Sequence, residues 1–132
     1  MPSEHPIDAI AAAVPEVSRW WIAYTADASY DSTLRRLHLV EMTMHLMSHA
    51  REGQLPNQRK FTQALDPLFE RADPDTDDAL ALSVIEEIIN NGPNHSIDPQ
   101  KLYRDLGPIA RAHWEYLYRY NRHEPWPPNA AA

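Results

Sequence analysis

Proline, glycine and short polar residues divide this sequence into segments whose apolar residues recur every three or four positions. That spacing places apolar side chains on one face of an α-helix, whereas a half-buried β-strand needs strict alternation. The sequence contains no alternating run rich in β-branched residues. The pattern therefore predicts an all-α fold.

The same residues predict where the helices begin and end. Proline is well tolerated in a first helical turn, and aspartate is a good N-terminal cap. The expected helical segments, the first and the sixth of them short, are 7–14, 16–26, 32–52, 57–71, 74–91, 98–107 and 108–120. Because the chain has 132 residues, we expect residues 1–120 to form a compact single-domain bundle of about five to six helices. Residues 121–132 should form an extended or disordered tail, rich in proline and alanine, from which Trp126 can dock.

The composition is typical of a folded, acidic protein. Hydrophobic residues make up 43% of the chain, cysteine is absent, and the net charge is −7. No apolar run approaches the roughly 18 residues that a membrane-spanning helix needs, and the N-terminus lacks the basic start of a signal peptide. We therefore expect a cytoplasmic protein with no membrane partner. The negative charge repels phosphate backbones, which argues against nucleic-acid binding and permits a basic protein partner.

The stretch HLVEMTMHLMSH comes nearest to a chemical motif. At 100° per residue, His38, Glu41, His45 and His49 fall within an arc of roughly 80° on one helix face. Glu41 and His49 lie roughly 12 Å apart along the axis, so only one adjacent pair can hold a given ion. The remaining ligands must come from other helices, and the spacing does not select among the candidates Glu86, Glu87, His95 and His113.

A packing role is the alternative interpretation of this stripe. The apolar residues of the same helix form one arc on each side of the histidines, with Leu37, Val40, Met44 and Met47 in one and Leu39, Met42 and Leu46 in the other. A helix that is apolar on two sides is usually central in a bundle, where histidine can pack and hydrogen-bond a neighbouring group. We therefore expect packing, no metal ion and no cofactor.

The acidic run DPDTDD invites comparison with a calcium-binding loop. Asp73, Asp75 and Asp77 match the first three alternating ligand positions of an EF-hand. However, Asp78 stands where that loop needs glycine, and Val84 stands where it needs glutamate. The run is better explained as a helix N-terminus, where acidic side chains favour the positive end of the dipole.

Ordinary catalytic signatures are missing. Glu86 and Glu87 are adjacent, so on a helix they point about 100° apart and cannot act as a paired-carboxylate site. The sequence has no strand, turn and helix arrangement around a nucleophilic serine, and its three glycines are isolated. We therefore expect a protein that is not an enzyme.

The C-terminal segment HWEYLYRY carries more aromatic residues than one side of a small bundle normally buries. One face of its predicted helix carries Ile109, His113, Tyr116, Leu117 and Tyr120, and another carries Trp114 and Tyr118. Surplus exposed aromatic surface is typical of a binding site for a partner. That partner can be a second copy of the chain, as in a homodimer.

Three stretches together resemble an uncharacterised all-helical bacterial family associated with predicted immunity proteins of toxin systems: STLRRLHLVEMTMHLMSHAREG, KFTQALDPLFERADPDTDDALALSVIEEIINN and LYRDLGPIARAHWEYLYRY. The resemblance covers about residues 32–120. It implies a small acidic protein that neutralises a cognate toxin by binding it without turnover. Because an acidic surface attracts a basic toxin, we expect the contact residues to be Asp75, Asp77 and Asp78, and then Glu86 or Glu87.

Two other classes of function stay open at the level of the sequence. One is a metal-binding helical protein, either a hydrolase or a small-molecule binder, built around His45 and His49. The other is a structural homo-oligomer that uses the aromatic surface.

Overall fold

A computed structural model describes residues 5–128. Its elements, in chain order, are α1 (Pro6–Ala13), α2 (Pro15–Ala26), α3 (Arg35–Ser48), α4 (Gln58–Arg71), α5 (Pro74–Leu80), the π-helical segment η1 (Ala81–Ile85), α6 (Glu86–Asn91), the 3-10 turn η2 (Gly92–His95), α7 (Pro99–Asp105) and α8 (Pro108–Arg122). The described residues contain no β-strand, and the prediction of an all-α single domain is confirmed. Because α5, η1 and α6 are continuous, they form one helix, so the described residues contain seven helices. This number matches the seven expected segments and is slightly above the five to six helices expected for the bundle.

The helix starts follow the local signals in the sequence. Proline occupies the first turn of α1, α2, α5, α7 and α8. Asp73 caps α5 by accepting a hydrogen bond from the Thr76 N–H at 2.7 Å, and Asp98 caps α7 through the Gln100 N–H at 3.0 Å. The acidic run is therefore a helix N-terminus, as expected.

The boundaries of α3 differ from the prediction of residues 32–52. Asp31 caps a turn rather than the helix, because its Oδ1 accepts from the Thr33 N–H at 2.9 Å and α3 begins at Arg35. At the other end, Arg51 and Gln54 form an antiparallel bridge around Glu52 and Gly53, whose φ angles are +55° and +78°. Two consecutive positive φ angles make a tight reversal that no helix can continue through. The reversal therefore excludes the predicted helix end at Glu52, and α3 ends at Ser48.

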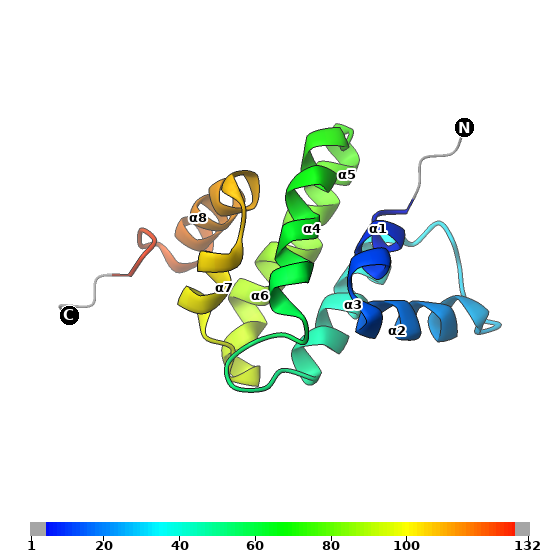
Figure 1. Cartoon of the computed structure of the whole chain (residues 1–132). Helices are drawn as coiled ribbons and strands as arrows, with labels where there is room; N and C mark the ends of the chain where they lie inside the picture. The colour runs from blue at the N-terminus through cyan, green and yellow to red at the C-terminus, as the bar shows by residue number, and fades with distance from the viewer. Residues whose placement is uncertain (1–4, 129–132) are drawn as a thin grey trace.

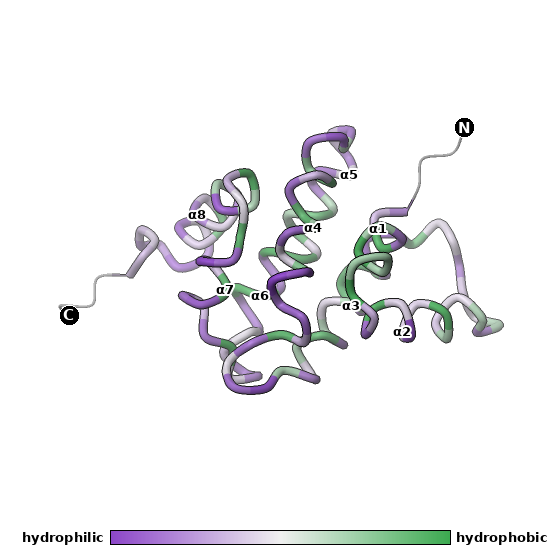
Figure 2. Tube along the Cα trace, viewed as in Figure 1, coloured by the Kyte–Doolittle hydropathy of each residue, from purple (hydrophilic) through white to green (hydrophobic). Residues whose placement is uncertain are grey.

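The long α4 and the continuous α5–α6 helix occupy the middle of the molecule, with α1, α2 and α3 on one side and α7 and α8 on the other (Figure 1). Figure 2 shows hydrophobic residues concentrated in α1 and hydrophilic residues along the front of α4. The core draws on every α-helix; its largest fully buried side chains are Trp114, Phe61, Ile7, Ile10, Leu39, Met42, Leu46, Met47, Leu65, Leu80, Ile85 and Leu102. Burial of these side chains is the main source of stability for such a bundle.

One of the two apolar arcs expected on α3 is only partly buried. Leu39, Met42 and Leu46 are fully covered, but Leu37 and Met44 are 46% and 51% exposed. The α5–α6 helix and α2 pack against α3 and cover the buried arc. The expectation that α3 is buried on both apolar sides is therefore wrong, and Leu37 and Met44 lie at the surface.

A carboxylate from α4 positions the start of α8. Asp66 Oδ2 accepts from the Ile109 N–H at 3.0 Å, and Asp66 Oδ1 accepts from the Ala110 N–H at 2.9 Å. These two donors would otherwise lack partners at the helix N-terminus. Gly107 allows this approach, because a Cβ there would overlap the Asp66 carboxylate.

The C-terminal segment turns back onto the bundle after α8, which ends at Arg122, two residues beyond the expected limit of the domain. The ring of Trp126 packs against Tyr103, Trp114 and Tyr118, with centroid separations of 5.2, 5.4 and 5.0 Å. Residues 129–132 of the expected tail, like residues 1–4, lie outside the described part of the chain. Within residues 5–128, no helix is both long and apolar enough to cross a bilayer.

Candidate functional site

The histidine stripe of α3 separates into two groups in the structure. His38 is buried, at 1% exposure, and lies beside His5 at the start of α1. Glu41 contacts Tyr24; burial and then the hydrogen bond to Glu41 raise the pKa of that tyrosine to about 12. His45 and His49 lie against the first turn of α2. The four residues therefore share a helix face, as expected, but their side chains contact different neighbouring residues.

Glu16, His45 and His49 converge at the junction of α2 and α3. His45 Nε2 lies 3.1 Å from Glu16 Oε1, and His49 Nε2 lies 4.0 Å from the same oxygen. The two imidazole rings are 4.5 Å apart between centroids. One ligand atom from each of the three residues fits within 4.8 Å of the others, and no other group of three such side chains in residues 5–128 does so. This arrangement has the size of a metal-binding cluster.

Neighbouring side chains hold this cluster in place. Arg19 Nη2 donates to Glu16 Oε2 at 2.6 Å, which leaves Oε1 facing the histidines. Hydrogen bonds from Arg19 and then from His45 lower the pKa of Glu16, so it is a carboxylate at neutral pH. The ring of Trp20 stacks against His45, with centroids 5.9 Å apart. The orientations of the acid and of one histidine are thus fixed by contacts outside the cluster.

The third member of the cluster is not one of the residues suggested by the sequence. Glu86 accepts from Asn121 at 3.1 Å, and Glu87 accepts from Asn91 at 2.7 Å. His113 stacks on a phenylalanine of α4 and lies 3.6 Å from Asp77. The fourth candidate, His95, is exposed in η2.

Glu16 had a local signal only as an acid in the first turn of a helix after Pro15. Helical periodicity relates residues on the same helix, whereas Glu16 meets His45 through the packing of α2 on α3. No pattern in the sequence relates those two faces.

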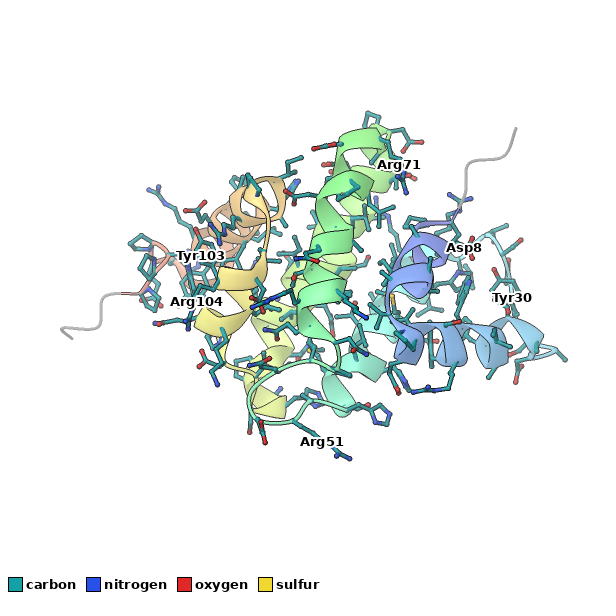
Figure 3. The ribbon with its side chains drawn as sticks, viewed as in Figure 1. Asp8, Tyr30, Arg51, Arg71, Tyr103 and Arg104 are labelled. Carbon is teal, nitrogen blue, oxygen red and sulfur yellow. The ribbon has the colours of Figure 1, made fainter. Side chains whose placement is uncertain are left out.

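His5 and His38 form a buried pair with a defined proton arrangement. His5 Nδ1 accepts from the Ile7 N–H at 3.1 Å, so neutral His5 carries its proton on Nε2 and donates it to His38 Nδ1 at 3.1 Å. Trp21 lies 4.9 Å from His5 and donates to Asp8 at 2.9 Å, while Tyr30 stacks on His38 at 5.0 Å. Figure 3 shows Asp8 on α1 and Tyr30 in the connection after α2 at the same end of the molecule.

Burial sets the charge state of this histidine pair. Desolvation, followed by the neighbouring His38 and Arg35, lowers the pKa of His5 from 6.5 to about 4. Burial also lowers the pKa of His38, against the opposing effect of a hydrogen bond to the Asp31 backbone. Both rings are therefore neutral at neutral pH, and the pair serves to join α1 to α3.

Two of the five predicted acidic contact residues, Asp77 and Glu86, lie where α5–α6 packs against α8. Asp77 faces His113 of α8 at 3.6 Å, and Glu86 accepts from Asn121 further along the same helix. Asp75 and Asp78 are exposed; the side chain of Asp75 is 91% exposed and lies 3.2 Å from Arg36.

Between its contacts with Asp77 and Glu86, α8 carries two exposed aromatic residues. Tyr116 and Tyr120 are 69% and 67% exposed, and their rings stack at 6.4 Å. In the sequence of α8 they lie between His113, which faces Asp77, and Asn121, which donates to Glu86. For the argument below we group these two tyrosines of α8 with three acidic residues of the adjacent α5–α6 helix, Asp77, Asp78 and Glu86, and call the five the acidic tyrosine surface.

Comparison with known proteins supplies no relative from which a function can be transferred. No family model matches the chain, and neither the curated proteins nor the solved structures include a significant match. The functional argument therefore rests on the chain's own residues.

Proposed function

We propose that this protein is a non-enzymatic inhibitor of the immunity type, which neutralises a basic bacterial toxin by binding it. The observation that carries the proposal is the pair of exposed, stacked rings of Tyr116 and Tyr120 on α8, the helix that also contacts Asp77 and Glu86. Large exposed aromatic side chains commonly act as anchors in protein interfaces. The resemblance of residues 32–120 to an immunity-associated family supports the same class of partner.

The charge of the chain suits a basic partner. The net charge is −7, and Asp75 and Asp78 are exposed at the N-terminal end of α5, near Asp77. Acidic groups around an interface steer a basic protein toward it and mainly raise the association rate. Desolvated tyrosine rings mainly slow dissociation, because their contacts must be broken before the partner leaves. The two kinds of residue should therefore have separable kinetic effects.

The decisive experiment uses the product of the neighbouring reading frame as the toxin. We expect co-expression of this protein to suppress its toxicity, and the purified pair to form a complex measurable by surface plasmon resonance. The paired changes Tyr116→Ala and Tyr120→Ala should raise the dissociation rate by about tenfold or more. The paired changes Asp77→Asn and Asp78→Asn should lower the association rate and weaken its dependence on salt.

Ile22 provides a matched control, because it is 67% exposed but lies on α2. The variant Ile22→Ala should bind the toxin as the unmodified protein does. Failure to suppress toxicity rejects the immunity role. If the tyrosine and aspartate changes leave both rate constants of binding unaltered, the acidic tyrosine surface is not the toxin-binding site.

A homo-oligomer built on the same tyrosines is the competing outcome of this experiment. Light scattering measures the molecular mass and distinguishes this outcome. If the unmodified protein is a dimer and the tyrosine variant is a monomer, then Tyr116 and Tyr120 mediate self-association. A monomer at high protein concentration leaves the surface available to another protein.

A further inference from the structure

We propose that Glu16, His45 and His49 bind one divalent transition-metal ion of the zinc class, through Glu16 Oε1 and the Nε2 atoms of the histidines. This inference does not rest on the proposed inhibitory function. It rests on the convergence of three ligand atoms from two helices.

The spacing of the three atoms fits a single ion. Tetrahedral zinc with bonds of about 2.0 to 2.1 Å to histidine and carboxylate separates its ligand atoms by about 3.3 Å. The distances from Glu16 Oε1 to His45 Nε2 and His49 Nε2 are 3.1 and 4.0 Å. The distance between Glu16 Oε1 and His45 Nε2 is already close to that expected between two ligands of one zinc ion. The side chain of His49 is 53% exposed, so a small rotation can bring its Nε2 to the same distance.

The chemistry of the donors selects the class of ion. Two imidazoles and one carboxylate suit borderline divalent ions such as zinc, whereas calcium and magnesium require more oxygen ligands. The i, i+4 spacing of His45 and His49 places both rings on one face of α3, toward Glu16. The exposed side of His49 leaves room for water to complete the coordination.

Arg19 and Trp20 act as positioning residues for this site. Arg19 binds Glu16 Oε2 and leaves Oε1 for the ion, and Trp20 stacks on the ring of His45. Such outer contacts reduce the motion of ligand side chains and strengthen metal binding. The ion would join the first turn of α2 to the last turn of α3 and its cap residue His49. Zinc should therefore raise the melting temperature of the protein.

The test is isothermal titration calorimetry. Zinc chloride is titrated into the untagged protein after a chelator has removed any bound metal. We expect one zinc ion per chain with a dissociation constant of about 10 μM or tighter, and a higher melting temperature that a chelator reverses. Cobalt(II) should bind at the same site and give a visible absorption band typical of nitrogen and oxygen ligands. The variants Glu16→Gln, His45→Gln and His49→Gln should each raise the zinc dissociation constant at least about tenfold.

Two histidines elsewhere serve as controls for nonspecific binding. His113 lies 3.6 Å from the Asp77 carboxylate, and His95 is exposed in η2. The variants His113→Gln and His95→Gln should leave zinc affinity unchanged, and circular dichroism should verify that every variant is helical. Absence of saturable binding up to about 100 μM zinc overturns the proposal. Binding that survives the three ligand changes, or that is lost in a control variant, also overturns it.

Discussion

The buried pair of His5 and His38 should make the stability of this fold sensitive to mild acid. Burial lowers the pKa of both rings in the folded protein, and that of His5 falls from 6.5 to about 4. In the unfolded chain, histidine titrates near its ordinary value of about 6.5. As the pH falls below that value, the unfolded state takes up protons that the folded state excludes, so folding becomes less favourable.

The pKa shift of His5 sets the size of the effect. A depressed folded pKa means that the full stability is present above pH 6.5, is lost as the pH falls toward about 4, and changes little below that. For His5 alone, proton linkage gives a loss of about 2 kcal/mol between pH 7 and pH 5. His38 changes stability in the same direction. Carboxylates contribute little in this window, because they titrate mainly below pH 5.

Urea unfolding followed by far-ultraviolet circular dichroism, at several pH values from 7.5 to 5, measures this loss. The variant His5→Asn retains an acceptor that can cap the Ile7 N–H but has no titrating group, so its stability should change much less over the same range. The exposed His123 provides the control, since His123→Asn should keep the pH dependence of the unmodified protein. A flat stability profile, or a His5→Asn profile that parallels the unmodified protein, would refute this reasoning.

Three further changes test how α7 and α8 are held. Asp66→Ala removes the acceptor of two N–H groups and should lower the free energy of unfolding by about 2 kcal/mol in urea titrations, with a smaller loss for Asp66→Asn. A loss below about 0.5 kcal/mol would contradict this role of the carboxylate. Gly107→Ala places a methyl group against the same carboxylate and should cost about 1 to 3 kcal/mol, seen as a lower melting temperature; an unchanged value would mean that Asp66 moves aside freely. Trp126→Ala removes ring contacts with three aromatic residues and should cost about 1 kcal/mol and alter the near-ultraviolet circular dichroism, whereas an identical spectrum would argue against docking of the tail.

Local sequence signals were sufficient for the identity of most helices and for several of their starts. Asp73 and Asp98 each precede a proline and cap a helix as expected, because the acceptor and the N–H donors lie within three residues of each other. The end of α3 was predicted less well. The expected helix ran to Glu52, but the chain reverses there through positive φ angles at Glu52 and Gly53, a conformation that is uncommon for glutamate.

Exposure was predicted poorly wherever it depends on which helices become neighbours. Leu37 and Met44 have the hydrophobicity and spacing of core residues, yet both are exposed. Their burial would have required a helix on that side of α3, and the packing of the chain provides none in its described part. Similarly, the sequence separated His113 from Asp77 and Asn121 from Glu86, whereas the packing of α8 beside α5–α6 brings each pair into contact.

The candidate metal site was likewise predictable in part from local sequence and in part only from the tertiary structure. The sequence by itself determined that His45 and His49 share a face of one helix, because helical periodicity fixes the direction of residues four apart. It also determined the acidic charge and the positions of the helix caps. Only the tertiary structure selected Glu16, which is 29 residues from His45, because the packing of α2 on α3 decides which side chains face each other. That packing depends on burial summed over many residues, and no single pattern in the sequence encodes it.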